Sequence, residues 1–159
     1  MLLEYKAKFI TPFIGSGKLN SQATRPILYS RKQFPKLFKY KFLKLIEKYI
    51  HRDIDDSVNL EESNMVDVSD DIHLEKADYP KVKEFTFLSK RNFNNPNGEN
   101  IMKSEYYPEG TKFILKLSFD AKKITKEQLK TIISTIGEFD GISQYGSQFG
   151  YGRFEEQKE

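Results

Sequence analysis

The chain has 159 residues and a formal net charge of +3, with two histidines and no cysteine. A chain of this length can form one domain with its own apolar core. The composition excludes disulfides and thiolate metal sites, and because no histidine cluster has ligand spacing we expect no metal and no cofactor. No apolar run approaches the roughly 20 residues of a membrane helix, and no signal peptide is evident, so we expect a cytoplasmic protein.

Charge is distributed unevenly along the sequence. Residues 1–52 carry twelve Lys/Arg and two Asp/Glu, whereas residues 53–78 carry one lysine and ten Asp/Glu. A basic block beside an acidic block indicates either an internal electrostatic contact or a surface for a polyanion. Segment 53–78 lacks the glycine and the terminal glutamate of a calcium-binding loop, so we interpret it as an acidic loop or insertion beside the core.

The first expected elements are a strand and a helix. Residues 3–10 alternate apolar and polar side chains, which is typical of a half-buried strand. Residues 15–18, Gly-Ser-Gly-Lys, lack the spacing of a phosphate-binding loop and are interpreted as a turn. Residues 25–31 suggest a short extended segment, for which Pro26 favours an edge position. Residues 36–50 place apolar side chains on one helical face and lysines on the other, and the lysine face is either solvated surface or a track for nucleic-acid phosphates.

The second half of the chain adds three expected strands and one helix. The strands are expected over residues 82–91, 111–119 and 149–155. Turn-forming residues dominate 92–98 and 106–110. Thr125 and Gln128 have the spacing of a capping box that opens a helix, and Gly137 is well placed to end it.

The predicted order is strand, helix, acidic segment, strand, strand, helix, glycine-rich loop and strand. This βαββαβ pattern is that of the ferredoxin-like α+β fold, a mainly antiparallel sheet with both helices on one face. We therefore expect residues 1–159 to form a single ferredoxin-like domain, with 53–78 as an acidic insertion or loop within it.

Residues 137–154 have the composition of a binding site. They contain five of the nine glycines, interleaved with aromatic residues and Arg153. Glycine permits close backbone approach and can contribute N–H groups to an anion-binding nest, while aromatic rings and arginine suit bases and phosphates. The candidate ligand-binding residues here are Gly141, Tyr145, Gly146, Gly150, Tyr151, Gly152 and Arg153. Further candidates, chosen because arginine suits phosphate, are Arg25, Arg31 and Arg91.

This glycine pattern resembles that of a known superfamily. A helix followed by Gly137, Gly141-Ile142, Gly146 and Phe149-Gly150-Tyr151-Gly152-Arg153-Phe154 is similar to the glycine-rich loop and final strand of the RAMP superfamily, the ferredoxin-fold RNA-binding proteins of CRISPR systems. With the opening Phe9-Ile10-Thr11-Pro12, it also resembles small phage-encoded proteins with similar ends. The resemblance implies RNA bound along the sheet and the glycine-rich loop. Several RAMP nucleases use an N-terminal histidine, which this sequence lacks.

Three functional hypotheses follow, and binding is favoured over catalysis. The first is a non-catalytic binder of RNA or a nucleotide-like phosphate ligand, encoded by a phage. The second is a protein-interaction module that inhibits or sequesters a host-defence component through acidic segment 53–78. The third is a metal-independent ribonuclease that uses His51 or tyrosine side chains as acid and base, although no paired catalytic constellation is visible. The aromatic residues near the end of the chain also have a purely structural interpretation as core residues.

Overall fold

A computed structural model of the chain describes residues 1–14, 37, 39–70, 72–75, 81–88, 93, 96–143 and 150–158. Its strands are β1 (Leu2–Phe9), β2 (Phe13–Ile14), β3 (Val66–Val68), β4 (His73–Leu74), β5 (Lys81–Leu88), β6 (Glu99–Tyr107), β7 (Lys112–Phe119) and β8 (Phe154–Glu156). Its helices are α1 (Lys39–Asp53), α2 (Lys126–Thr135) and the π-helical turn η1 (Ile136–Asp140). The α+β class expected from the sequence is confirmed.

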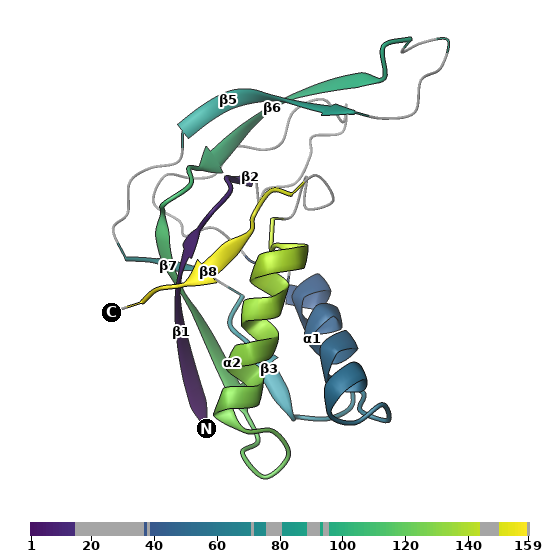
Figure 1. The fold of residues 1–159 in the computed structure, drawn as a ribbon, viewed down its shortest axis with the longest axis vertical. Coiled ribbons are helices and arrows are strands. Elements are labelled where there is room, and N and C mark those ends of the chain that lie inside the picture. The colour runs from purple at the N-terminus through teal and green to yellow at the C-terminus, as the bar shows by residue number, and fades with distance from the viewer. Residues whose placement is uncertain are drawn as a thin grey trace.

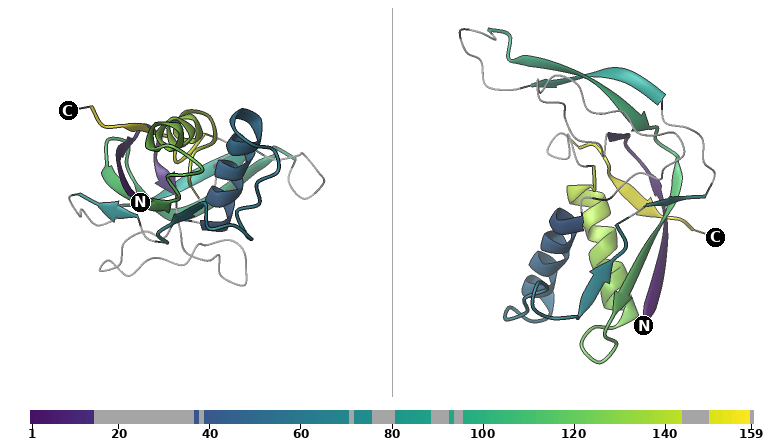
Figure 2. Two further views of the ribbon diagram at one scale, coloured as in Figure 1. Left: turned by 90° about the horizontal axis from the view of Figure 1, so that it is seen from below. Right: turned by 180° about the vertical axis from the view of Figure 1, so that it is seen from behind.

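The main sheet contains β3, β7, β1 and β8 in that spatial order, and β4 also pairs with β7. All of these pairings are antiparallel. Strand β1 lies between β7 and β8, with Tyr5 opposite Leu115 and Phe9 opposite Phe154. Helices α1 and α2 lie side by side on one face of this sheet (Figures 1 and 2).

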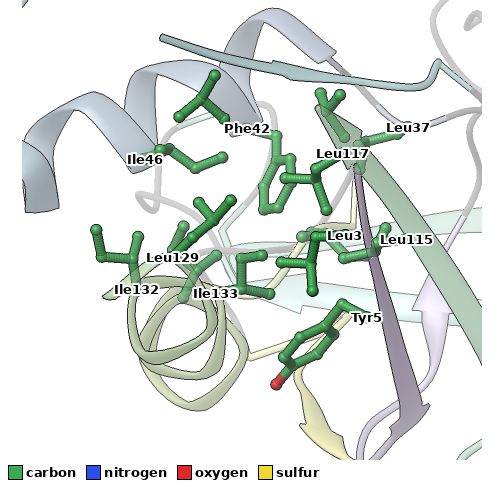
Figure 3. Packing of buried hydrophobic residues seen from close by; sticks show 14 of the residues in the cluster. Leu3, Tyr5, Leu37, Phe42, Ile46, Leu115, Leu117, Leu129, Ile132 and Ile133 are labelled. Carbon is green, nitrogen blue, oxygen red and sulfur yellow. The ribbon is translucent and has the colours of Figure 1, made fainter. Parts of the chain in front are cut away.

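The core lies between the main sheet and the two helices (Figure 3). Every second side chain of β1 and β7 is buried, as the alternation predicts. These residues are Leu3, Tyr5, Ala7, Phe9, Phe113, Leu115, Leu117 and Phe119. The helices contribute Phe42, Ile46, Tyr49, Ile50, Leu129, Ile132 and Ile133. Each large apolar side chain buried here contributes about 1.5–3 kcal/mol, so this interface is the main source of stability.

Helix α2 begins as the sequence predicts and ends later. The Thr125 side chain accepts a hydrogen bond from the Gln128 N–H, and the Gln128 side chain accepts one from the Thr125 N–H, which completes the capping box. The helix does not stop at Gly137, because it continues as η1 to Asp140. Gly141, with φ +74°, ends it instead.

The strand assignment differs from the predicted one. The expected strand 82–91 corresponds to β5, which pairs with β6 in a second sheet of order β2-β6-β5 and not with the main sheet. The edge position beside β7 is taken by β3, which comes from acidic segment 53–78. Strand β6 is not predicted: no element is expected over residues 99–105, and the last two residues of β6 fall in the predicted turn 106–110. The sequence Glu-Asn-Ile-Met-Lys-Ser-Glu lacks the alternation that would have revealed it.

Strands β5 and β6 form a long hairpin that extends away from the main sheet (Figure 1). Strand β2 joins it to the body, because Phe13 pairs with Tyr107 and Ile14 with Tyr106. The hairpin is therefore attached to the main sheet through the chain that directly follows β1. The expected extended segment 25–31 lies outside the described residues.

The acidic segment contacts the basic helix α1. The Lys39 ammonium lies 3.0 Å from an Asp67 carboxylate oxygen and 3.7 Å from one of Asp70, and Lys44 lies 3.5 Å from Glu61. The hydrogen bond with Asp67 is the main reason that the pKa of Lys39 is raised. Of the two interpretations of the charge blocks, the structure supports an internal contact at these lysines.

Candidate functional site

The glycine-rich end of the chain packs against the segment that follows β1. The Gly152 N–H donates to the Pro12 carbonyl at 2.8 Å, and the Ile142 N–H donates to the Gly152 carbonyl at 3.0 Å. The Ile10 N–H donates to the Arg153 carbonyl at 2.9 Å, which extends the β1–β8 pairing by one step. We call residues 141–143 together with residues 150–153 the glycine corner.

Two glycines of this corner are required for close packing. A Cβ on Gly141 would lie 2.7 Å from the Tyr151 carbonyl oxygen, and one on Gly152 would overlap the backbone and Cβ of Ser143. Both residues also have positive φ, +74° and +77°. Gly137 is closed off in the same way, because a Cβ there would lie 2.5 Å from the Phe154 carbonyl oxygen. Because these glycines have no side chain, two backbone segments come into direct contact. The glycines therefore have a structural role.

Gly150 differs from the other glycines of the corner. It has φ +91°, but among the described residues a Cβ built on it would meet only the Arg153 guanidinium, at 3.9 Å. Its carbonyl accepts a hydrogen bond from the Thr11 hydroxyl at 2.7 Å, and the same Thr11 oxygen accepts from the Arg153 N–H at 2.9 Å. Thr11 thus fixes the turn on which Arg153 sits.

Arg153 has a buried donor without a partner among the described residues. Its guanidinium lies over Gly150. Its Nε is buried, and no described residue places an acceptor within hydrogen-bond distance of it. A buried donor without a partner costs about 1–3 kcal/mol, and more when charged. An anion at this turn would supply the missing acceptor.

Tyr151 links the glycine corner to the hairpin. Its ring packs edge-on against Phe85 of β5, with centroids 5.4 Å apart, and Phe85 packs edge-on against Tyr106 at the same distance. The Lys83 ammonium lies 4.8 Å from the Phe85 centroid and 4.7 Å from that of Tyr106. Tyr151 is half-buried, and its ring contact with Phe85 joins the glycine corner to the hairpin.

Two further contacts hold the corner in place. The buried Ser143 hydroxyl donates to the Ile14 carbonyl at 2.9 Å and accepts from the Ile14 N–H at 3.0 Å. The Tyr49 hydroxyl of α1 donates to Asp140 of η1 at 2.7 Å. Burial, followed by this hydrogen bond and the nearby carboxylate charge, raises the pKa of Tyr49 to about 12. Asp140, the last residue of the π-helical turn η1, is therefore hydrogen-bonded to α1.

The structure brings together five of the residues singled out in the sequence. They are Gly141, Gly150, Tyr151, Gly152 and Arg153. The other five candidates, Tyr145, Gly146, Arg25, Arg31 and Arg91, lie outside the described residues. Sequence reasoning missed Thr11 and Ser143, whose partners lie more than a hundred positions away. No local motif could have identified them.

No three described His, Asp or Glu residues are grouped so that they could hold a metal ion. His51 contacts the Val58 carbonyl at the end of α1, whereas His73 belongs to β4. In the part of the chain that the structure describes, no helix is long and apolar enough to cross a membrane.

The comparisons with known proteins gave structural matches alone. No protein-family model matches the sequence, and no curated protein matches it. A solved structure of the type III-B Cmr-beta complex bound to cognate target RNA contains a chain that is similar over 99% of this chain, with a TM-score of 0.62 and 14% identity. This chain spans 58% of that one.

Two other solved structures match over the same share of this chain. A chain of a type IV-B CRISPR complex has a TM-score of 0.59 and 12% identity, and 90% of it is covered. Cmr6 from Pyrococcus furiosus has a TM-score of 0.56 and 10% identity, and 98% of it is covered. At these identities the likeness concerns the fold alone, and it shows that this chain is folded like these three solved chains.

Proposed function

We propose that this chain is a non-catalytic RNA-binding protein that holds RNA, or a nucleotide-like phosphate ligand, at the glycine corner. The observation that carries the proposal is the fold similarity over 99% of the chain to a component of a complex whose structure contains target RNA. The Arg153 Nε, which has no acceptor among the described residues, provides the local support, because phosphate oxygens are suitable acceptors for a guanidinium.

We also propose a single ferredoxin-like domain over residues 1–159. In this proposal β1, α1, β3, β7, α2 and β8 form the βαββαβ unit, and the β5–β6 hairpin is an addition between β3 and β7. The sheet order β3-β7-β1-β8 supports it, because each helix then connects two strands that are separated by one neighbour. Within segment 53–78, only the residues outside β3 and β4 would be an insertion.

In the bound state, the Arg153 guanidinium would face a phosphate across the open side of Gly150. Gly150 has no side chain there, so the phosphate could approach the backbone of the turn. The half-buried Tyr151 would lie beside the neighbouring nucleoside. Tyr145, Gly146, Arg25, Arg31 and Arg91, which lie outside the described residues, remain proposed ligand-binding residues.

Fluorescence anisotropy with labelled poly(U) and poly(A) tests this proposal. Arg153→Ala should weaken binding to both RNAs by a similar factor and lower the slope of log K against log salt by about 0.7, the value for one single-strand phosphate. Arg52→Ala is the charge-matched control, because the Arg52 guanidinium already pairs with Asp53. If the wild type does not bind either RNA at low salt, or if the two variants behave alike, the proposal is wrong.

A second candidate is a protein-interaction module of phage origin that inhibits or sequesters a host-defence component. It is favoured by the acidic side chains of segment 53–78 that remain exposed, such as Asp56 and Glu62, after Asp67 and Glu61 have paired with α1. Replacing Asp56 and Glu62 by Asn and Gln should abolish binding to such a partner and leave poly(U) binding unchanged. Loss of poly(U) binding in that variant would argue against this division of roles.

A further inference from the structure

A cleft of about 270 Å³ opens on the outer side of the β1–β7 pair, beside the end of β8. Its lining consists of Lys8, Lys112, Glu155, Glu156, Gln157 and Lys158. Lys8 lies between the buried residues Ala7 and Phe9, and Lys112 precedes the buried Phe113. Because side chains alternate along a strand, both lysines are on the face that does not carry the helices.

The carboxylates near this cleft are already engaged by lysines. The Lys8 ammonium lies 3.3 Å from Glu155, and Glu156 pairs with Lys130 of α2 at 2.8 Å. The Gln157 side chain donates to the Ala7 carbonyl at 2.7 Å. Among the described residues, no carboxylate lies within ion-pair distance of Lys112. The cleft therefore has an excess of positive charge.

Lys112 is also placed unfavourably in the free protein. The register of β1 and β7 sets it directly opposite Lys8. Like charges directly opposite each other in an antiparallel pair are destabilising. Glu155 pairs with Lys8 from the other side, since it is opposite Lys8 in the β1–β8 register. On the other side of Lys112 lies Glu75, whose N–H donates to the Lys112 carbonyl at 3.2 Å, but among the described residues Lys112 has no ion pair. An anion between the two lysines would remove the repulsion.

The cleft and the glycine corner belong to one face of the molecule. Phe154 is buried, so its neighbours Arg153 and Glu155 alternate toward the opposite side of β8. They are two residues apart, which is roughly 7 Å along a strand. Arg153, Lys8 and Lys112 thus form a line of cations across β8, β1 and β7.

We infer that Lys8 and Lys112 form a second phosphate contact for the same single-stranded RNA that the proposed function places at Arg153. In the free protein the Glu155 carboxylate pairs with the Lys8 ammonium. On binding, a backbone phosphate of the RNA replaces this carboxylate. Glu155 is then a competitor of the ligand, and the contact is independent of base sequence.

Two opposite substitutions test the inference. Lys112→Gln removes one phosphate contact, so it should weaken poly(U) binding about fivefold at 0.1 M salt and lower the salt slope by about 0.7. Its melting temperature should stay the same or rise, because the repulsion with Lys8 is lost. Glu155→Gln should do the reverse and strengthen binding, because it removes the competing carboxylate. The charge-matched controls are Lys122→Gln and Glu62→Gln, which are exposed and lie outside the cleft.

The outcomes separate this inference from the proposed function on which it rests. If Arg153→Ala weakens binding while Lys112→Gln matches Lys122→Gln, the glycine corner stands and the second contact is refuted. A weaker affinity for Glu155→Gln would also refute it, because a competitor cannot support binding. If the wild type does not bind poly(U) at any salt concentration, both proposals are overturned together.

Discussion

Gly152→Ala should be among the most destabilising single substitutions in the glycine corner. Gly152 has φ +77°, and a Cβ there would overlap the backbone and Cβ of Ser143. An alanine in the left-handed region costs about 1–2 kcal/mol. Overpacking that displaces a backbone costs about 1–3 kcal/mol more, so we expect a total loss of about 2–5 kcal/mol in the free energy of unfolding.

Gly110→Ala is the matched control for this experiment. Gly110 has φ +86°, and nothing lies within 4 Å of a Cβ built on it. Its N–H donates to the Phe9 carbonyl at 2.7 Å, a bond that alanine retains. This variant should therefore lose only the backbone term of about 1–2 kcal/mol.

Urea denaturation followed by circular dichroism measures both values, provided that the m-value stays constant. The difference between the two losses isolates the cost of separating Gly152 from Ser143. Equal losses for the two variants would refute the argument that the corner is held by direct backbone contact. Such a result would also remove the structural reason for the glycines and favour a role in ligand binding.

Three further predictions concern stability. Ser143→Ala should cost about 1–3 kcal/mol in urea denaturation, because the buried N–H and carbonyl of Ile14 lose their partner; a loss below 0.5 kcal/mol would contradict the buried pairing. Thr125→Ala should lower the unfolding free energy by about 1 kcal/mol through the lost cap, and an unchanged melting temperature would contradict it. Burial raises the pKa of Tyr5 to about 12, with a smaller opposing effect from its hydrogen bond to Ser134. The folded pKa exceeds the unfolded value near 10, so the protonated Tyr5 hydroxyl contributes to the free energy of unfolding. This contribution is fully present below pH 10, and up to about 3 kcal/mol of it is lost as the pH rises toward 12. Tyr5→Phe should flatten that part of the pH profile, and an unaltered profile would show that another group is responsible.

The sequence predicts those elements whose pattern is local. Strand β1 and strand β7 follow the alternation, and the capping box at Thr125 sets the start of α2. The cluster of glycines identifies the corner in the same way, because the residue type itself carries the signal.

The remaining features depend on contacts that are distant in the sequence. Strand β3 has three residues inside an acidic segment, and its pairing with β7 is what makes it a strand. Helix α2 continues into η1, which contains Gly137, and Phe154 packs closely on that glycine from another element. The hydrogen bonds of Thr11 and Ser143 likewise have no counterpart in any local pattern.

The central position of β1 has a consequence for how the protein is made. Its partners are β7 and β8, so residues such as Leu3 and Phe9 pair with Leu117 and Phe154, more than a hundred positions later. On the ribosome, this alternating strand emerges long before β7 and β8, so it lacks both partners until they have been synthesised. Its unpaired edges are open to other nascent chains during that time. We therefore expect folding to be slow for a chain of this size, as is usual for non-local sheets, and recombinant yield to rise when translation is slowed or chaperones are supplied.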